Sequence, residues 1–360
     1  MEKKIAVLKG DGIGPEVISH AIEVLDAIAD KYNHTFHYKH ALIGGYAIDE
    51  TGDPLPQMTV DTCTDSDAVL LGAIGDPKYD NNPNATIRPE QGLLAIRKVL
   101  GLYANVRPVK VYSDLKKLSP LKEDRLDNVD MVIYRELTGG IYFGEKKKSA
   151  SEASDLCHYQ RYEIERIAKL AFDEASRRDY RLCLVDKANV LESSRLWRRV
   201  VQEMCRDYPE VTVSYLYIDN AAMQLILNPG QFDVILTSNM FGDILSDEAS
   251  VIGGSLGMLP SASFGDKHRL YEPVHGSYPQ AAGKDIANPF AMIMSASMML
   301  RDFGLIQEAD DIQSAIEDCI KLGISTEDIN RDDANRSSEV TKALCNLIAG
   351  ESLHSTVRNV

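Results

Sequence analysis

Short apolar runs alternate with longer amphipathic stretches along most of this chain. Three of the short runs are predicted to be buried strands, residues 4–8, 67–72 and 181–187. Three of the longer stretches have the apolar spacing of helices, residues 15–31, 159–178 and 195–208. Buried strands that are connected through helices form parallel sheets. The alternation predicts an α/β fold, and a length of 360 residues leaves room for two domains.

Ionisable side chains stand at the ends of three successive strands in the second half of the chain. Lys187 ends the run RLCLVDK, Asp219 ends VTVSYLYID, and Asp243 lies just beyond FDVILTSN. Ligands of α/β sheets bind outside the carboxyl ends of the strands. A lysine in this position can act as a base, although an ordinary salt bridge explains it equally well. The recurrence predicts a binding site at this edge of the sheet.

Asp243 and Asp247 lie four residues apart in the run NMFGDILSDEASVIGG, which has helical apolar spacing. Residues four apart share one face of a helix, so the two carboxylates repel unless a cation lies between them. Mg²⁺ takes oxygen ligands and often only one or two protein carboxylates. A bare D-x-x-x-D pattern is more often a solvated helix face. The apolar strand before it and the Gly pair after it favour a metal site here.

The glycine-rich loop after the first strand does not have the dinucleotide-binding spacing. G-x-G-x-x-G needs a third glycine three residues after the second, and in GDGIGPEV that place holds Pro15 or Val17. Pro15 is instead predicted to be the first residue of a helix. The loop is therefore a tight strand-to-helix connection, which either approaches a ligand or only turns the chain. A second long loop, residues 76–92, is polar and proline-containing, and such loops are functional or disordered.

Three arginines lie close to the ends of predicted elements, where they can converge on one anion. They are Arg97, Arg107 and Arg135, and Arg135 directly follows the apolar run 131–134. Arginine binds carboxylates in a bidentate manner and stays charged when partly buried. Taken singly, Arg97 and Arg107 are better explained as ordinary surface arginines, and Arg135 is the exception because it follows that apolar run. Tyr142 lies just beyond a Gly–Gly turn and is a candidate acid or hydrogen-bond donor.

Composition excludes several classes of partner. The net charge of −15 argues against nucleic-acid binding, which needs a basic face. No apolar run reaches the length of a membrane span, and MEKKIAVLKGDG enters a strand pattern without a signal-peptide core. Six scattered cysteines without a C-x-x-C pair are typical of reduced thiols. We therefore expect a cytoplasmic protein with a small-molecule ligand.

Six motifs together resemble the metal-dependent, decarboxylating β-hydroxyacid dehydrogenases, the family of isocitrate and 3-isopropylmalate dehydrogenases. They are GDGIGPEV, EQGLLAIRK, RELTGGIYFG, DKANVL, NMFGDILSDEAS and EPVHGSYPQAAGKDIANP, and they span nearly the whole chain. The resemblance implies a non-Rossmann α/β fold with a cofactor-side domain built from both chain ends, residues 1–102 and 254–360. The second domain, residues 103–253, would carry the dimer contacts and the metal and base residues. An arm near residues 140–157 would pair with a second subunit, which gives a homodimer with shared active sites.

The resemblance also implies a substrate with a C2 hydroxyl and two carboxylates. Mg²⁺ or Mn²⁺ would bind the hydroxyl and the adjacent carboxylate through Asp243, Asp247 and Asp219, the last from the other subunit. Lys187, also from the other subunit, would take the hydroxyl proton while hydride passes to the nicotinamide of NAD. After CO₂ leaves, Tyr142 would protonate the product enolate. Arg97, Arg107 and Arg135 would hold the carboxylate that leaves, and the other substrate-binding residues would be Asn189 and Asp219.

Substrate choice in this family is implied to rest on the EQGLL segment. Isocitrate-specific relatives have Ser and Asn in place of Gln91 and Leu93, where they bind a third carboxylate. Here Leu93 and Leu94 offer apolar surface to an isopropyl group, and Glu90 repels an extra carboxylate. The resemblance thus implies oxidative decarboxylation of 3-isopropylmalate to 4-methyl-2-oxopentanoate, in leucine biosynthesis. A homologous activity on tartrate or malate, homoisocitrate or isocitrate is the alternative.

The resemblance places the cofactor on the segment around EPVHGSYPQAAGKDIANP. The implied contacts are Glu272, His275, Gly276, Ser277, Gln280, Ala287 and Asn288. NAD-specific relatives have Asp in place of Gln280, and NADP-specific relatives have Lys–Tyr in place of Gln280–Ala281. Because Gln–Ala offers no cation for a phosphate, we expect NAD. A regulatory subunit would have lost Tyr142, Lys187 or the aspartates. An anion-binding module would keep the arginines but would not need Lys187 and Tyr142, so the presence of all these residues favours an enzyme.

Overall fold

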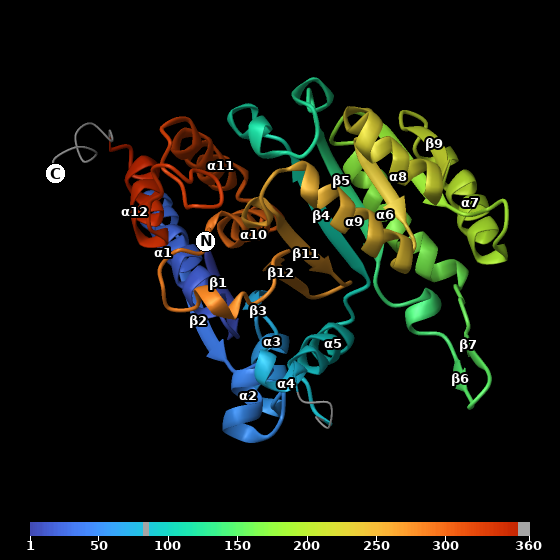
Figure 1. Ribbon diagram of the computed structural model, residues 1–360, viewed down its shortest axis with the longest axis horizontal. Helices are drawn as coiled ribbons and strands as arrows, with labels where there is room; N and C mark the ends of the chain where they lie inside the picture. Colours follow the sequence, from blue (N-terminus) through green and yellow to red (C-terminus); the bar gives the residue numbers. More distant parts are fainter. Residues whose placement is uncertain (82–85, 352–360) are drawn as a thin grey trace. The chain divides into compact units, whose positions relative to one another are not determined.

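A computed structural model describes residues 1–81 and 86–351, which fall into two compact units (Figure 1). Unit 1 consists of residues 1–101, 255–262 and 266 onward, so it draws on both ends of the chain. Unit 2 consists of residues 102–254 and 263–265. Both units combine strands and helices, which confirms the predicted α/β class. The roles expected of the two domains, cofactor binding and dimer contact, stay predictions.

Unit 1 is built on a sheet whose central strands are parallel. The strands run in the order β2 (Thr35–Ala41), β1 (Glu2–Gly10), β3 (Ala68–Ala73), β12 (Arg269–Pro273) and β11 (Pro260–Phe264), whose last two residues belong to unit 2. The register of β1 and β3 pairs Ile5 with Ala68 and Leu8 with Leu71, and these side chains are fully or almost fully buried. The helices of this unit are α1 (Gly14–Tyr32), α2 (Gly44–Thr51), α3 (Gln57–Thr64), α4 (Pro77–Asp80), α5 (Pro89–Val99), α10 (Phe290–Asp302), α11 (Ile306–Lys321) and α12 (Ser337–Ile348).

Helix α1 begins and ends where its sequence predicts. Pro15 occupies the first turn, where a missing N–H costs nothing, and Glu16 follows in the region that favours negative charge. The helix stops because Asn33 adopts the left-handed conformation, with φ of 56°, and its N–H bonds the carbonyl of Ala29. The apolar face of α1 is buried, and the helix packs on α10 and α12.

Unit 2 is built on a second run of strands, most of them parallel. Their order is β4 (Ala104–Lys110), β5 (Asp130–Glu136), β10 (Val234–Thr237), β8 (Arg181–Asp186) and β9 (Thr212–Tyr217). Strand β10 is parallel to β5 and β8, β8 is parallel to β9, and β4 is antiparallel to β5. The carboxyl ends of four strands therefore meet at one edge. The helices are α6 (Arg161–Ala175), α7 (Glu192–Met204), α8 (Ile218–Leu227) and α9 (Asn239–Ile252).

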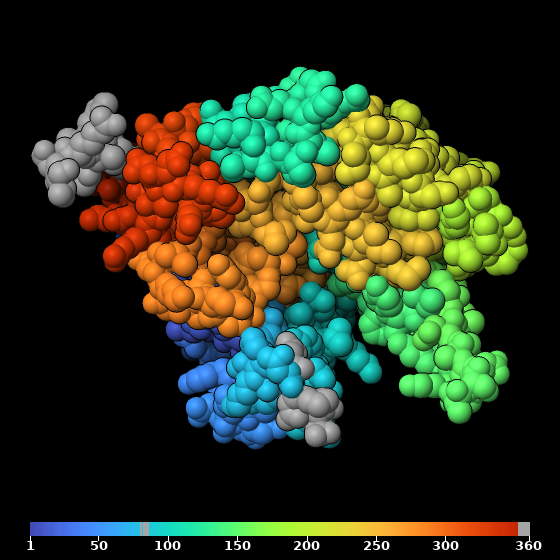
Figure 2. Space-filling view, in the orientation of Figure 1, coloured from blue at the N-terminus to red at the C-terminus, as the bar shows by residue number. Residues whose placement is uncertain are grey.

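A short hairpin stands away from the rest of unit 2, as Figures 1 and 2 show. It consists of β6 (Lys146–Lys148) and β7 (Ala153–Asp155), paired in antiparallel fashion, and every residue from 145 to 158 is exposed. Two-stranded hairpins are marginally stable in water unless they pack on something. The arm suggested by the sequence is thus a hairpin with no apolar support of its own.

Two expectations from the sequence need correction. The strand that was to end at Asp219 ends at Tyr217, and Asp219 lies in the first turn of α8, where the helix dipole favours a carboxylate. The long loop over residues 76–92 contains α4 and the start of α5, each introduced by a proline; residues 82–85 of it lie outside the described part. No helix in the described ranges is long and apolar enough to cross a membrane.

Phe172 of α6 allows a test of the core of unit 2. Its side chain is fully buried, and its ring stacks on Tyr208 with centroids 4.6 Å apart. We expect Phe172→Ala to lower the free energy of unfolding by about 3–5 kcal/mol, because the cavity cannot fully collapse. Tyr162 on the same helix is 53% exposed, and Tyr162→Ala should cost less than about 1 kcal/mol. Urea unfolding followed by circular dichroism measures both; equal losses would contradict this description of the core.

Candidate active site

Two carboxylates on α9 are each paired with an arginine from the neighbouring strands of unit 2. Arg135 Nη1 donates to Asp243 Oδ1, and Arg107 Nη1 donates to Asp247 Oδ1 at 2.7 Å. Asp243 and Asp247 lie one turn apart, so their charges repel unless they are neutralised. The two guanidinium groups supply that neutralisation. The predicted convergence of Asp243, Asp247, Arg107 and Arg135 therefore exists within this unit.

The register of β4 and β5 explains why both arginines reach α9. Asn105 lies directly opposite Arg135, so the two side chains share one face of the sheet. Arg107 is two residues beyond Asn105 and points to the same face. Arg107 Nε donates to Asn105 Oδ1 at 2.9 Å, which holds the guanidinium in place.

Two residues that the sequence analysis did not single out bring Arg135 against α9. The Oδ1 atom of Asn239 accepts from Arg135 Nε and Nη2 at 3.2 and 3.0 Å. Gly242 leaves room for the arginine, because a Cβ atom there would lie 2.6 Å from Arg135 Cγ. The sequence feature that could have identified both residues is the spacing of Asn239, Gly242 and Asp243, with the amide one helical turn before the carboxylate.

Tyr142 joins the same group of side chains. Its hydroxyl donates to Asp243 Oδ2 at 2.9 Å, and partial burial, followed by this hydrogen bond, raises the pKa of the phenol. The turn that carries it is anchored by Glu136, a fully buried carboxylate that accepts from the N–H groups of Thr138 and Gly139 at 2.8 and 2.7 Å. Burial raises the pKa of Glu136 above its ordinary value.

Lys187 and Asp219 form a separate pair at another part of the strand-end edge. Lys187 Nζ lies 2.8 Å from Asp219 Oδ2, and this hydrogen bond lowers the pKa of Asp219. The backbone N–H of Lys187 donates to Ser194 Oγ at 3.0 Å. Among the described residues no hydrogen bond or ion pair connects the pair to Asp243 or Asp247. Asn189 lies exposed in the turn that follows Lys187.

In unit 1, one buried carboxylate ties together the loops that follow the parallel strands. Asp11 accepts from the N–H groups of Gly45, Tyr46 and Gly75 at 3.0, 3.0 and 2.9 Å. The sequence analysis did not identify Asp11, although an acid inside a Gly-rich strand-end loop was a visible feature. These bonds fix the edge of the sheet where α/β proteins bind ligands.

The loops after β1 and β12 also touch each other. Ile13 N–H donates to the carbonyl of Ser277 at 2.8 Å. Gly12, with φ of 56°, lies so close that a Cβ atom would overlap the same carbonyl oxygen. Glu90 lies nearby, since a Cβ at Gly75 would be 3.2 Å from Glu90 Oε1 and 3.4 Å from Ser277 Oγ. The predicted residues Glu90 and Ser277 are therefore neighbours.

Helix α5 carries the residues predicted to select the substrate. Leu94 is 57% exposed and Leu93 is half-buried, so both present apolar surface. Arg97 Nη2 donates to Glu272 Oε1 at 2.6 Å, whereas its buried Nε has no hydrogen-bond partner in the described part of the chain. Arg97 thus belongs to unit 1, whereas Arg107 and Arg135 belong to unit 2, and the meeting of all three arginines stays a prediction.

Several side chains of the segment predicted to bind the cofactor form hydrogen bonds within the protein. Asn288 accepts from the N–H of Phe290 at 3.0 Å and donates to Asp328 at 2.9 Å. His275 Nδ1 lies 3.0 Å from its neighbour's carbonyl, and its buried Nε2 has no partner. Burial lowers the pKa of His275, which keeps the ring neutral. Ala287 is buried, whereas Gly276 and Gln280 are exposed.

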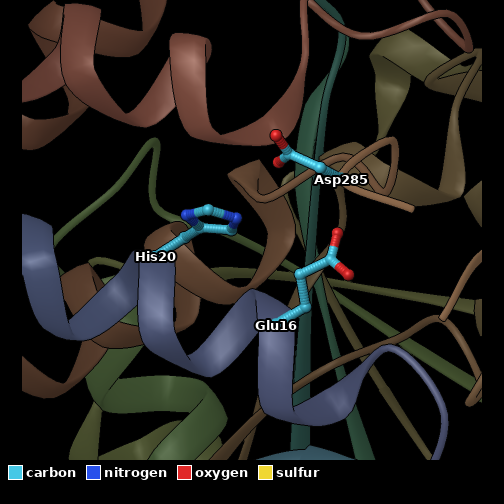
Figure 3. Close-up of side chains that lie close together, drawn as sticks. All are labelled: Glu16, His20 and Asp285. Atoms are coloured by element: carbon cyan, nitrogen blue, oxygen red, sulfur yellow. The ribbon is translucent and has the colours of Figure 1, made fainter. Parts of the chain in front are cut away.

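The predicted metal ligands do not form a ready cluster in the single chain. Within the part of the chain that the structure describes, the set of three metal-ligating side chains lying close together is Glu16, His20 and Asp285 (Figure 3). Asp243 and Asp247 are turned to arginines, and the predicted third ligand, Asp219, was expected from another subunit. The metal assignment to these three aspartates remains a prediction.

Comparison with known proteins shows which class of protein these α/β units belong to. A profile of the isocitrate/isopropylmalate dehydrogenase family matches residues 4–344. The chain belongs to this family, which confirms the resemblance seen in the sequence.

Individual relatives are more similar still. The protein named 3-isopropylmalate dehydrogenase in Halalkalibacterium halodurans is 54% identical, with 99% of each chain covered. Its namesake in Bacillus subtilis (strain 168) is 51% identical over the full length of both. Among solved structures, isocitrate dehydrogenase from Methylococcus capsulatus has a TM-score of 0.84 at 32% identity, covering 96% of this chain and 99% of that one. A beta-decarboxylating dehydrogenase from Thermococcus kodakarensis has a TM-score of 0.82 at 35% identity, covering 99% and 100%.

The contact between Gly12 and Ser277 generates a prediction for unit 1. Gly12→Ala adds a methyl group that overlaps the Ser277 carbonyl, so the two loops must separate. Gly52 also has a positive φ, of 76°, but nothing lies within 4 Å of a Cβ placed there. Gly52→Ala therefore isolates the backbone strain, about 1–2 kcal/mol. We expect Gly12→Ala to lose more stability than Gly52→Ala in urea unfolding, and similar losses would refute the steric contact.

Proposed function

We propose that this protein catalyses the NAD-dependent oxidative decarboxylation of 3-isopropylmalate to 4-methyl-2-oxopentanoate in leucine biosynthesis. Relatives that carry the name 3-isopropylmalate dehydrogenase cover the whole chain at more than half identity, which supports this assignment. The observation that carries it is the pairing of Arg107 with Asp247 and of Arg135 with Asp243, with Tyr142 on the same carboxylate.

These ion pairs suit a site in which a substrate and a cation replace the partners of the arginines and aspartates without changing the net charge. A dicarboxylate substrate and a divalent cation together are neutral, and so are two arginine–aspartate pairs. On binding, the guanidinium groups of Arg107 and Arg135 would turn to the substrate carboxylate, and Asp243 and Asp247 would turn to the cation. No unpaired charge is buried at any stage, which avoids the large desolvation cost of an isolated ion.

The donor set of Asp243, Asp247 and the partner subunit's Asp219 fits a hard cation. All the ligand atoms are carboxylate oxygens, the type that Mg²⁺ and Mn²⁺ prefer. When bound, the cation supplies Lewis acidity at the hydroxyl oxygen, and the nicotinamide ring accepts the hydride. The protein contributes the positions of the groups around these two.

Lys187 and Tyr142 would move the protons. Lys187 is held 2.8 Å from Asp219, and we assign it the role of the base that removes the C2 hydroxyl proton, directly or through water. The Tyr142 phenol carries its proton at neutral pH, and its hydroxyl lies 2.9 Å from Asp243 Oδ2, on the same carboxylate that Arg135 pairs with. We assign it the protonation of the product enolate after CO₂ leaves.

Substrate choice would rest on the exposed apolar surface of α5. Leu93 and Leu94 would cover an isopropyl group, and each buried CH₂ is worth about 0.8 kcal/mol. Glu90 would repel a third carboxylate, such as the one that isocitrate carries. Asn189, exposed in the turn beyond β8, would contact the substrate from the other subunit.

We assign NAD to the loops of unit 1 at the ends of β1, β3 and β12. Among the described residues nothing lies within 4 Å of a Cβ placed on Gly276, so a ligand can approach the backbone there, and the unpartnered Nε2 of His275 offers it a hydrogen bond. Gln280 is exposed and uncharged, so it provides no cation for a 2′-phosphate. All six cysteines, each in the described part, are free thiols, which agrees with a reducing cytoplasm.

We further propose a homodimer in which the arm formed by β6 and β7 packs on a second subunit. The arm is exposed along its whole length, and a lone hairpin needs such a support. Leu156 and Phe143 at its base are 52% and 58% exposed, so they offer apolar surface to a partner. A dimer would also bring Lys187 and Asp219 of one chain to the aspartates of the other.

Turnover tests the substrate and the cofactor together. The purified protein with Mn²⁺ should reduce NAD when given 3-isopropylmalate, and it should act far more slowly on isocitrate or with NADP. NADH absorbance measures the rates. Leu94→Ala should lower kcat/KM for 3-isopropylmalate about tenfold. Val99, 49% exposed at the end of α5, provides the matched control, and Val99→Ala should leave the rate unchanged.

The outcomes separate the alternatives. Faster turnover of isocitrate, homoisocitrate, tartrate or malate would keep the chemistry and refute the substrate. No turnover of any of these acids by the folded, metal-loaded protein would refute the enzyme.

Shared active sites give a prediction of their own. Lys187→Met and Asp243→Asn should each lower kcat at least about 10²-fold. A dimer with one subunit of each variant keeps one site that has both native residues, so it should regain roughly half the wild-type activity. The two variants, co-expressed with different affinity tags and purified through both, provide this heterodimer. Activity no higher than that of the single variants would place Lys187 and Asp243 in the same site of one subunit.

A further inference from the structure

A buried histidine on α1 is left without hydrogen-bond partners. His20 is 6% exposed, and within the described residues neither ring nitrogen forms a hydrogen bond. The Oε1 atom of Glu16, one turn earlier, is also buried and unpartnered. Such groups cost free energy unless a ligand satisfies them. None of the roles assigned above to the dehydrogenase uses either side chain.

Asp285 completes a three-sided arrangement around these atoms. Glu16 and His20 are four residues apart and share one face of α1, whereas Asp285 comes from the loop before α10. One ligand atom from each of the three residues lies within 4.8 Å of the other two, and the side chains converge on one space (Figure 3).

Neighbouring groups orient both carboxylates. Gly283 N–H donates to Glu16 Oε2 at 3.2 Å, while Glu16 Oε1 has no hydrogen-bond partner among the described residues. Ser338 N–H donates to Asp285 Oδ1 at 2.8 Å, and the Ser338 hydroxyl donates to Oδ2. Outer hydrogen bonds of this type fix the ligands of metal sites.

We propose that Glu16, His20 and Asp285 form a second metal site, selective for a Zn²⁺-like transition-metal ion. One imidazole and two carboxylates match the three protein ligands that Zn²⁺ commonly takes, with water in the fourth position. Imidazole also suits Co²⁺ and Ni²⁺, whereas Mg²⁺ prefers oxygen ligands only. The site therefore differs in chemistry from Asp243 and Asp247.

Burial of the ring supports the same assignment. His20 is 6% exposed, so bulk water does not compete for its ring nitrogens. An ion bound there would join α1 to the loop at residues 283–285 and, through Ser338, to the start of α12. All of these elements belong to unit 1, so binding should stabilise this unit.

Co²⁺ provides a spectroscopic probe. Co²⁺ is titrated into the Asp243→Asn protein in excess Mg²⁺. The substitution and the Mg²⁺ keep Co²⁺ from binding at the predicted catalytic site. We expect a saturable visible absorption band of one Co²⁺ per chain, at an intensity typical of four- or five-coordination, and a rise in Tm that Zn²⁺ reproduces. His20→Ala should abolish both. Glu16→Gln, which keeps the size of the side chain, should weaken Co²⁺ binding roughly tenfold or more.

His40→Ala serves as the matched control. His40 lies on β2 of the same unit and outside the cluster, so this variant should keep the band and the Tm shift. Absence of the band from the folded parent protein would overturn the proposal and leave the space to water. A band that survives both His20→Ala and Glu16→Gln would also overturn it, because the ion would then lie elsewhere.

Discussion

Two carboxylates one turn apart on α9 are the constraint around which unit 2 is arranged. Asp243 and Asp247 repel each other, and because Asp247 remains 71% exposed, water and salt screen part of that repulsion. Arg135 and Arg107 remove the rest. Three features position these arginines against α9: the antiparallel pairing of β4 with β5, the amide of Asn239, and the absence of a side chain at Gly242.

The sequence predicted the elements and the edge of the sheet, because both follow from local patterns. Apolar spacing located α1 and α9 to within a residue or two, and Lys187 directly follows β8, whereas Asp219 lies in α8 and not at the end of β9. The hydrogen-bond and ion-pair partners of these residues could not be predicted from the sequence. Which arginine pairs with which aspartate depends on the register of β4 against β5, and register is a long-range property that composition does not encode.

Asp11 and His20 show the same limit from the opposite side. Asp11 stands in a motif that was examined for its glycines, yet its function is to accept three N–H groups that come from residues 45, 46 and 75. The spacing of Glu16 and His20 places them on one face of a helix, but no local pattern predicts that Asp285, which lies 265 residues after His20, joins them. Sites built across such separations emerge only when the chain has folded.

A net charge of −15 would repel a dianionic substrate if all the charges acted at the site, but most of them lie too far away to do so. At physiological ionic strength, charges are screened beyond about 8 Å, so most of the acidic surface is not felt at the site. Within that range the local balance decides, and there Arg107 and Arg135 face the two aspartates of α9. A substrate that arrives as its complex with a divalent cation carries no net charge at all. An acidic protein can therefore bind this dicarboxylate without a basic surface, provided that cation and arginines divide its two carboxylates between them.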